Sequence, residues 1–311
     1  MEIRKLPIGQ GLTWFKQSID LGGHNPRGVF GAAALMLVAL YAVGLVIIVP
    51  MVAAMAGAGD ADDLGAALGR IWPFLLLMVL AISVLLPFLV GGLMHVIRET
   101  EAGNKPGALA VFRPFRSGRL GSLAATGLLM LAIQVVGGAL VMLTGGAEYL
   151  QAYAEMMRGL LSGADPRTLA QPEASLLMFV LQLLVNYVGY AVLLFTVPSV
   201  LFLGASLGDA LGGSLKASFR NLGANLLAGL LLVVALIVAG LLFLLLMMLV
   251  ALVANAIHGV VGAIATLVLG LLFASAVIVV LVGAAYLAWR DTFGGRAPTA
   301  TPGDAPAGFE A

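Results

Sequence analysis

Long apolar stretches separated by short polar segments dominate the chain. Five such stretches occur, at Gly28–Gly59, Ile71–Ile97, Leu120–Ala147, Ala174–Gly208 and Ala224–Trp289. A helix needs about 20 apolar residues to cross a hydrocarbon core of about 30 Å. The last stretch would be about 99 Å long as one helix, so we expect it to fold back at its only polar interruption, Asn255–Gly259. Six membrane-spanning helices are therefore predicted, at approximately 29–55, 71–96, 121–143, 175–203, 224–253 and 260–289.

Three segments that precede the odd-numbered spans combine apolar and aromatic residues at helical spacing with basic neighbours. They include Gly11–Lys16, Ala108–Arg116 and Ala210–Arg220. This pattern is typical of short helices that lie in the membrane interface, with their cationic heads among lipid phosphates. The predicted fold class is an all-α, polytopic membrane helix bundle of six transmembrane helices plus short interfacial amphipathic helices. The three units of interfacial helix and hairpin raise the hypothesis of a threefold repeat, with chance similarity as the alternative.

Three regions follow from this organisation. We predict a cytoplasmic N-terminal interfacial helix in residues 1–28, a six-span membrane domain in 29–290 and a disordered cytoplasmic tail in 291–311. The tail is rich in Pro, Gly, Ala and Thr, a composition typical of disorder. The loop at 144–174 carries apolar residues at a spacing of 3.6 and is expected to form a further amphipathic helix.

The distribution of basic residues predicts the orientation. Thirteen of the 16 lysines and arginines fall in the segments on one side of the predicted membrane, and the other side has only Arg70, Arg158 and Arg167. Cytoplasmic loops carry the excess of basic residues, so both termini are expected in the cytoplasm. The tryptophans (Trp14, Trp72, Trp289) fall at predicted membrane boundaries, where an aromatic belt is expected.

Composition excludes several classes of protein. Apolar residues make up 61% of the chain and charged residues only 10%. Soluble domains have about 45–50% apolar and about 25% charged residues, so the composition excludes a soluble globular protein. The formal net charge of +1 gives no reason to expect a nucleic-acid partner, and the absence of cysteine excludes disulfides and thiolate metal sites. Asp60, Asp62 and Asp63 lack the spacing of a calcium loop, so no metal and no cofactor are predicted.

Charged side chains are absent from the middle of every predicted span. Ion-coupled carriers and proton relays place ionisable groups there, so that class is disfavoured. The fourth span instead carries Gln182, Asn186 and Tyr190 at intervals of four residues, a polar stripe that Gln134 of the third span would complete. Two interpretations stay open: hydrogen bonds between helices, or the polar lining of a cavity or headgroup groove.

Basic and aromatic residues gather before the third and fifth spans. Such clusters suit anionic lipid headgroups, and an ordinary positive-inside anchor is the alternative. The candidate headgroup-binding residues are Phe112, Arg113, Phe115, Arg116, Lys216 and Arg220. The segment Gly204–Gly208 matches the G-x-S-x-G pattern of serine hydrolases, but that motif needs a strand-to-helix turn and a positioned histidine. We therefore predict no catalytic residue.

Several short motifs resemble an uncharacterised six-span inner-membrane family of proteobacteria. They are Leu86–Met94, Gly103 with Pro106 and Phe112–Arg116, Val197–Val200, Ala210–Leu211 and Ser218–Leu222. That family is in turn similar to the membrane domain of some glycerophosphodiester phosphodiesterases. The resemblance covers residues 1 to about 290 and implies a location in the bacterial inner membrane. It implies no activity, because the catalytic barrel of those enzymes is absent from this sequence.

The sequence thus predicts a non-enzymatic, multi-pass protein of the bacterial inner membrane with an accessory, scaffolding or lipid-associated role. Its expected partners are membrane lipids, and a homo-oligomer or another membrane protein would also fit. The alternative function is a passive or exchange-type transporter of a lipid or an uncharged solute that uses the polar stripe. A hydrated cavity at the stripe would favour transport, and a dry, close-packed core would favour the accessory role.

Overall fold

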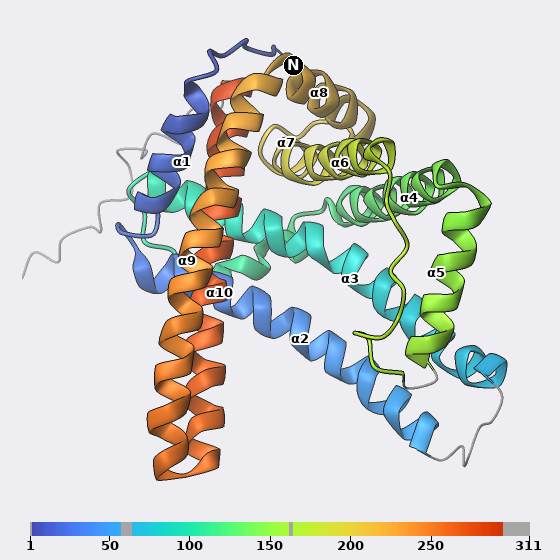
Figure 1. The fold of residues 1–311 in the computed structure, drawn as a ribbon. Coiled ribbons are helices and arrows are strands. Elements are labelled where there is room, and N and C mark those ends of the chain that lie inside the picture. Colours follow the sequence, from blue (N-terminus) through green and yellow to red (C-terminus); the bar gives the residue numbers. More distant parts are fainter. Residues whose placement is uncertain (1, 57–63, 162–163, 295–311) are drawn as a thin grey trace, which may run out of the picture. The chain divides into compact units, whose positions relative to one another are not determined.

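Helices form all the regular structure in the described part of the chain, which in the computed structural model comprises residues 2–56, 64–161 and 164–294 (Figure 1). In chain order they are α1 (Gln10–Asp20), α2 (Pro26–Ala56), α3 (Leu64–Glu101), the 3-10 helix η1 (Ala108–Arg116), α4 (Leu120–Thr144), α5 (Gly146–Leu161), α6 (Leu176–Ala191), the π-helical turn η2 (Val192–Thr196), α7 (Val197–Phe202), α8 (Leu207–Arg220), α9 (Leu222–Ile257) and α10 (Gly259–Phe293). The all-α prediction is confirmed.

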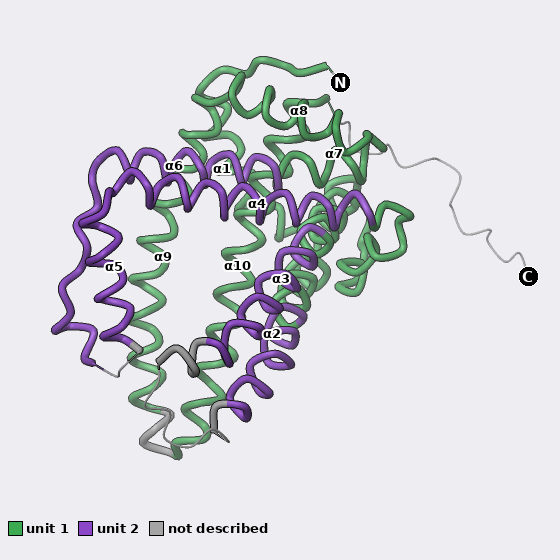
Figure 2. Tube along the Cα trace, turned by 90° about the vertical axis from the view of Figure 1, so that its right-hand side faces the viewer, with its two compact units in different colours: residues 1–38, 88–120, 194–311 green, residues 39–87, 121–193 purple. Residues whose placement is uncertain are grey.

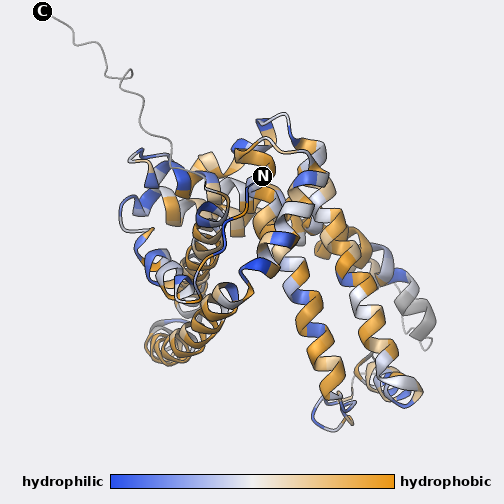
Figure 3. Ribbon diagram, turned by 90° about the horizontal axis from the view of Figure 1, so that it is seen from above, coloured by the Kyte–Doolittle hydropathy of each residue, from blue (hydrophilic) through white to orange (hydrophobic). Residues whose placement is uncertain are grey.

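Six of these helical segments are long and apolar enough to cross a membrane, so the protein is a multi-pass membrane protein. The segments are Pro26–Ala54, Gly69–Glu101, Leu120–Thr144, Leu176–Phe202, Leu222–Val253 and Gly259–Phe293. They correspond one to one with the six predicted spans, and several run further into the polar segments than the sequence indicated. Hydrophobic residues run along the long helices in Figure 3, as a lipid environment requires.

The fifth and sixth spans form a helical hairpin, as predicted. Residue His258 separates α9 from α10 in an extended conformation, and its Nδ1 accepts a hydrogen bond from the Val260 amide at 3.2 Å. The rings of Phe243 and Phe273 stack between the two helices at 4.1 Å. A histidine cap therefore starts α10 where the sequence offered only a polar interruption.

The fourth span is interrupted near its end. The π-helical turn η2 separates α6 from α7, which begins with Val197 and Pro198. Proline has no amide hydrogen, and its ring displaces the carbonyl four residues earlier, here that of Leu194. The π turn lies where proline removes the regular helical hydrogen bond.

The chain divides into two compact units (Figure 2). Unit 1 comprises residues 1–38, 88–120 and 194–311, and unit 2 comprises 39–87 and 121–193. Unit 1 contains α1, η1, α7–α10 and the adjoining ends of α2 and α3. Unit 2 contains most of α4, all of α5 and α6, and the remaining parts of α2 and α3.

Aromatic side chains form the centre of unit 1. Trp14, Tyr286 and Trp289 are at most 2% exposed. Trp72, by contrast, is 65% exposed. The aromatic-belt interpretation is therefore wrong for Trp14 and Trp289, because their indole rings are packed inside the protein and do not face lipid headgroups.

Close approaches at glycine join elements within each unit. In unit 1 a Cβ at Gly92 of α3 would collide with the backbone carbonyl of Val111 in η1. In unit 2 a Cβ at Gly127 of α4 would collide with the backbone carbonyl of Ser83 in α3. Only a residue without a side chain permits these separations, as is usual between membrane helices.

Two predictions fall partly outside the described residues. Helix α10 continues to Phe293, so the predicted tail at 291–311 begins too early, and residues 295–311 lie outside the described part of the chain. The same holds for Asp60, Asp62 and Asp63. The predicted amphipathic helix in the 144–174 loop is confirmed as α5.

Candidate functional site

The predicted headgroup-binding residues before the third span lie on η1. This element is a 3-10 helix rather than an α-helix, so residues three apart share a face. Val111 and Pro114 are buried on one side. The intervening residues of η1 therefore project outward, and Arg113, Phe115 and Arg116 are exposed, whereas Phe112 is half-buried.

Contacts with α3 orient two of these side chains. The ring of Phe115 stacks on Phe88 with 4.6 Å between centroids and is 37% exposed. The Arg113 Nη1 lies 3.0 Å from His95 Nε2. A guanidinium can only donate hydrogen bonds, so His95 accepts at Nε2 and carries its proton on Nδ1. Both contacts hold η1 on α3 while leaving basic groups on the surface.

The other predicted headgroup-binding residues lie on the exposed side of α8. The opposite side of α8 is buried and consists of small residues: Ala210, Ser214, Ala217 and Ser218. The Thr196 hydroxyl donates a hydrogen bond to Ser214 Oγ at 3.0 Å, which ties α8 to the end of the fourth span. Lys216 and Arg220 are exposed, and Phe219 between them is 49% exposed. The helix thus presents the mixture of cations and apolar surface that the sequence predicted.

The serine of the G-x-S-x-G match acts as a helix cap. Ser206 precedes α8, and its Oγ accepts a hydrogen bond from the Asp209 amide at 3.2 Å. The same hydroxyl donates to Asp209 Oδ2 at 2.6 Å. This is the ordinary arrangement at the start of a helix.

A cluster of charged residues in unit 1 was not foreseen from the sequence. Arg290 forms ion pairs with Glu101 and, at 2.8 Å, with Asp291. The Tyr286 hydroxyl donates to the other oxygen of Glu101 at 2.8 Å. These side chains come from the ends of α3 and α10, and the pairing satisfies charges that are only about 20% exposed.

The same cluster holds α1. Gln10 Nε2 and Trp14 Nε1 each donate to Asp291 Oδ2 at 2.9 Å. Asp291 therefore joins Arg290 of its own helix to two side chains of α1. In the sequence, Asp291 follows Trp289 closely and Trp14 lies in the predicted N-terminal helix. Their separation along the chain gave no indication that the two side chains form a hydrogen bond.

The N-terminal segment is bound to the junction of α8 and α9. The side chain of Asn221, which is 2% exposed, accepts from the Leu6 amide at 2.9 Å and donates to the Arg4 carbonyl at 3.0 Å. The Arg4 amide in turn donates to the Thr292 carbonyl at 2.9 Å. The first residues of the chain thus connect α9 with the end of α10.

The polar stripe lies in unit 2 and is only partly assembled. Gln182 donates to Asn186 Oδ1 at 3.0 Å, a hydrogen bond within α6. The amide of Gln134 in α4 lies over Gly189, next to the stripe, whereas Tyr190 is 56% exposed. The hydrogen bond that the structure describes within the stripe therefore runs along α6.

The described side chains contain no group of three or more His, Asp or Glu residues placed to hold a metal ion. The described ion pairs involve only Glu101, Arg290 and Asp291. Arg116, Lys216 and Arg220 therefore have no acidic partner within the described residues.

A comparison of the chain with known protein families, with characterised proteins and with solved structures finds no match.

Proposed function

We propose that the protein is a non-enzymatic component of the bacterial inner membrane with both termini in the cytoplasm. Its role is accessory: it associates with anionic lipids and supports the organisation of the membrane or of a partner protein. The proposed orientation rests on the asymmetric distribution of lysine and arginine. The resemblance to a proteobacterial inner-membrane family supports the proposed location.

The observation that carries this proposal is the exposed surface of η1 and α8. Arg116, Lys216 and Arg220 are exposed and unpaired within the described residues, beside the partly exposed rings of Phe115 and Phe219. Each basic side chain near an anionic leaflet contributes about 1 kcal/mol to membrane association. Aromatic neighbours add apolar contact with the acyl boundary. This surface suits phosphate-bearing headgroups.

Lipid co-purification with charge-neutral variants tests the proposal. We expect the triple variant Arg116→Gln, Lys216→Gln, Arg220→Gln, reconstituted in phosphatidylcholine with phosphatidylglycerol, to bind phosphatidylglycerol about a hundredfold more weakly and so to lose most of it on solubilisation. Three interactions of about 1 kcal/mol each are lost. Quantitative mass spectrometry of the bound lipid measures the change.

A matched control exists in the same chain. Arg70, Arg158 and Arg167 are also exposed, but Arg70 lies at the start of the second span, and Arg158 and Arg167 lie between the third and fourth spans. Their triple change to Gln removes the same charge and is expected to leave the retained phosphatidylglycerol unchanged. Equal retention by both triple variants and the unaltered protein would contradict the proposal.

A further inference from the structure

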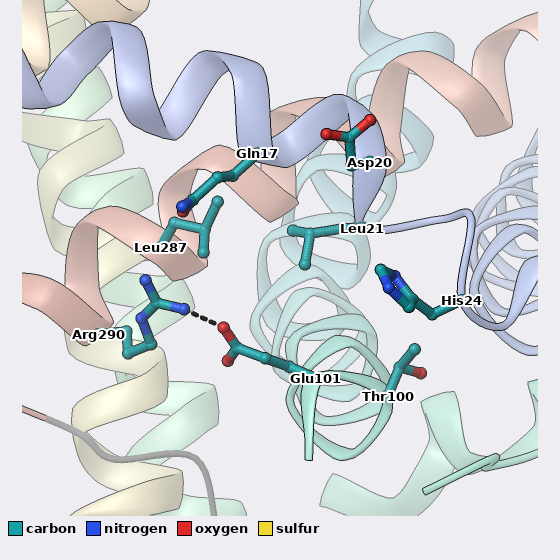
Figure 4. Close-up of a pocket in the computed structure, with 8 residues that line it drawn as sticks. All are labelled: Gln17, Asp20, Leu21, His24, Thr100, Glu101, Leu287 and Arg290. Atoms are coloured by element: carbon teal, nitrogen blue, oxygen red, sulfur yellow. Dashed lines mark hydrogen bonds and ion pairs between the residues drawn. The ribbon is translucent and has the colours of Figure 1, made fainter. Parts of the chain in front are cut away.

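A cavity of about 230 Å³ lies in unit 1 beside the charged cluster. The end of α1, the turn into α2 and the ends of α3 and α10 surround it. Figure 4 shows Gln17 and Leu21 projecting from the α1 side, opposite Thr100 and Glu101 of α3. Because the second span ends at Glu101 and the sixth at Phe293, the cavity lies where two spans end.

The lining of the cavity has an excess of negative charge. Among the described residues that line it, Arg290 is the only lysine or arginine. Carboxylates already bind its guanidinium: Nη1 contacts Glu101, and both Nε and Nη2 contact Asp291. Asp20, a further lining residue, is exposed and forms no ion pair within the described residues. A cavity with a saturated arginine and an unpaired carboxylate attracts a cationic ligand.

The size of the cavity and its walls identify the kind of cation. The volume equals that of roughly seven or eight water molecules, and the described acidic and histidine side chains form no metal-binding group. Leu21 and Leu287 provide apolar surface for carbon atoms of a ligand. An organic cation of a few carbon atoms therefore fits better than a metal ion.

Hydrogen-bond acceptors distinguish between organic cations. A primary ammonium has three N–H donors, and Gln17, Thr100 and Glu101, each of which carries a side-chain oxygen, are among the residues that line the cavity. The Thr100 hydroxyl already donates to the Val96 carbonyl at 2.8 Å, so its oxygen is left to accept. A quaternary ammonium needs aromatic faces, and the described residues that line the cavity include no aromatic ring apart from the imidazole of His24.

We infer that this cavity binds a primary ammonium group, carried either by a small free amine or by a headgroup of the phosphatidylethanolamine type. Glu101 and Asp20 provide the negative charge, and Gln17 and Thr100 accept hydrogen bonds from the ammonium. The ligand binds between α1 and the ends of α3 and α10. The surface of η1 and α8 takes no part in this binding.

Calorimetric titration of the purified, full-length protein in detergent with ethanolamine tests the inference. We expect saturable binding of ethanolamine and much weaker binding of choline. Asp20→Asn is expected to weaken ethanolamine binding by about tenfold, and its exposed position keeps folding intact. Glu155→Gln on α5 removes the same charge from another exposed site and is the matched control, with unchanged affinity.

Lipid retention distinguishes the two sources of the ammonium group. The protein is mixed with equal amounts of phosphatidylethanolamine and phosphatidylcholine and analysed by native mass spectrometry. Preferential retention of phosphatidylethanolamine that Asp20→Asn abolishes identifies a lipid headgroup as the ligand. Binding of ethanolamine without this preference identifies a free amine. The inference is overturned if neither ligand binds, if choline binds equally well, or if Asp20→Asn behaves like Glu155→Gln.

Discussion

Two polar side chains, Asn221 and Asp291, connect segments of unit 1 that are far apart in sequence. Asn221 bonds to the backbone of residues more than 200 positions away, at Leu6 and Arg4. Asp291 accepts from Gln10 and Trp14 while it pairs with Arg290. A buried polar group without a partner is costly, so each such residue stabilises one arrangement of the segments that it joins.

Asn221→Leu tests this role. The substitution leaves the Leu6 amide and the Arg4 carbonyl without their partner, which should lower the free energy of unfolding by about 1–3 kcal/mol. Equilibrium unfolding in mixed detergent micelles measures this free energy.

Asn104→Leu is the control, because Asn104 is exposed and its only described side-chain hydrogen bond is to Glu99. We expect this variant to change the free energy of unfolding by less than about 0.5 kcal/mol. Equal effects of the two variants would refute the connecting role of Asn221.

Interfacial elements differ in helix type although their sequences look similar. Segments α1 and α8 are α-helices, whereas η1 is a 3-10 helix with Pro114 inside it. The buried residues Val111 and Pro114 are three positions apart, which matches the 3-10 period. The contact of η1 with α3 then depends on Gly92, where the two backbones meet.

Gly92→Ala is expected to separate η1 from α3. The added methyl group would collide with the Val111 carbonyl, and such overpacking costs about 1–3 kcal/mol. Gly138→Ala on α4 is the matched control, because nothing lies within 4 Å of a Cβ at that position. Alanine favours helix over glycine by about 0.5–1 kcal/mol, so this variant should unfold at the same or a slightly higher temperature. Thermal unfolding in detergent compares the two, and a Gly92→Ala protein as stable as Gly138→Ala would rule out the close contact.

Six apolar helices and a one-sided distribution of cations characterise the whole molecule. The fifth and sixth spans pair along the α9–α10 hairpin, and an even number of spans is what the proposed cytoplasmic position of both termini requires. At about 1.5 Å per residue, α9 with 36 residues is about 54 Å long. That length exceeds a hydrocarbon core of about 30 Å, so the polar ends of the helix reach beyond it.

Cysteine labelling tests the proposed orientation. The chain has no cysteine, so a single introduced thiol reports one position. Thr168→Cys, in the exposed segment after α5, should react with a membrane-impermeant maleimide in intact cells. Lys105→Cys, in the exposed segment before η1, should react only after the membrane is permeabilised. The reverse pattern would place the termini outside the cytoplasm.

Local patterns were enough to predict the helices. The thickness of the hydrocarbon core imposes a length on each span, and unsatisfied backbone groups exclude any other regular structure except a closed barrel. The α9–α10 hairpin, the amphipathic α5 and the exposed cations of α8 were predicted for this reason. Their signals lie in neighbouring residues, where periodicity and composition are visible.

Contacts between distant segments required the tertiary structure. Glu101 and Arg290 are separated by 189 positions, and an apolar helix has no sequence marker for the side that faces its neighbours when lipid is as hydrophobic as the interior. For the same reason the burial of Trp14 and Trp289 and the exposure of Tyr190 could not be foreseen. The periodicity and length of the apolar stretches determine which residues enter the membrane. Packing between helices determines which polar helix ends contact one another, and the contact between the ends of α1, α3 and α10 forms the acidic cavity.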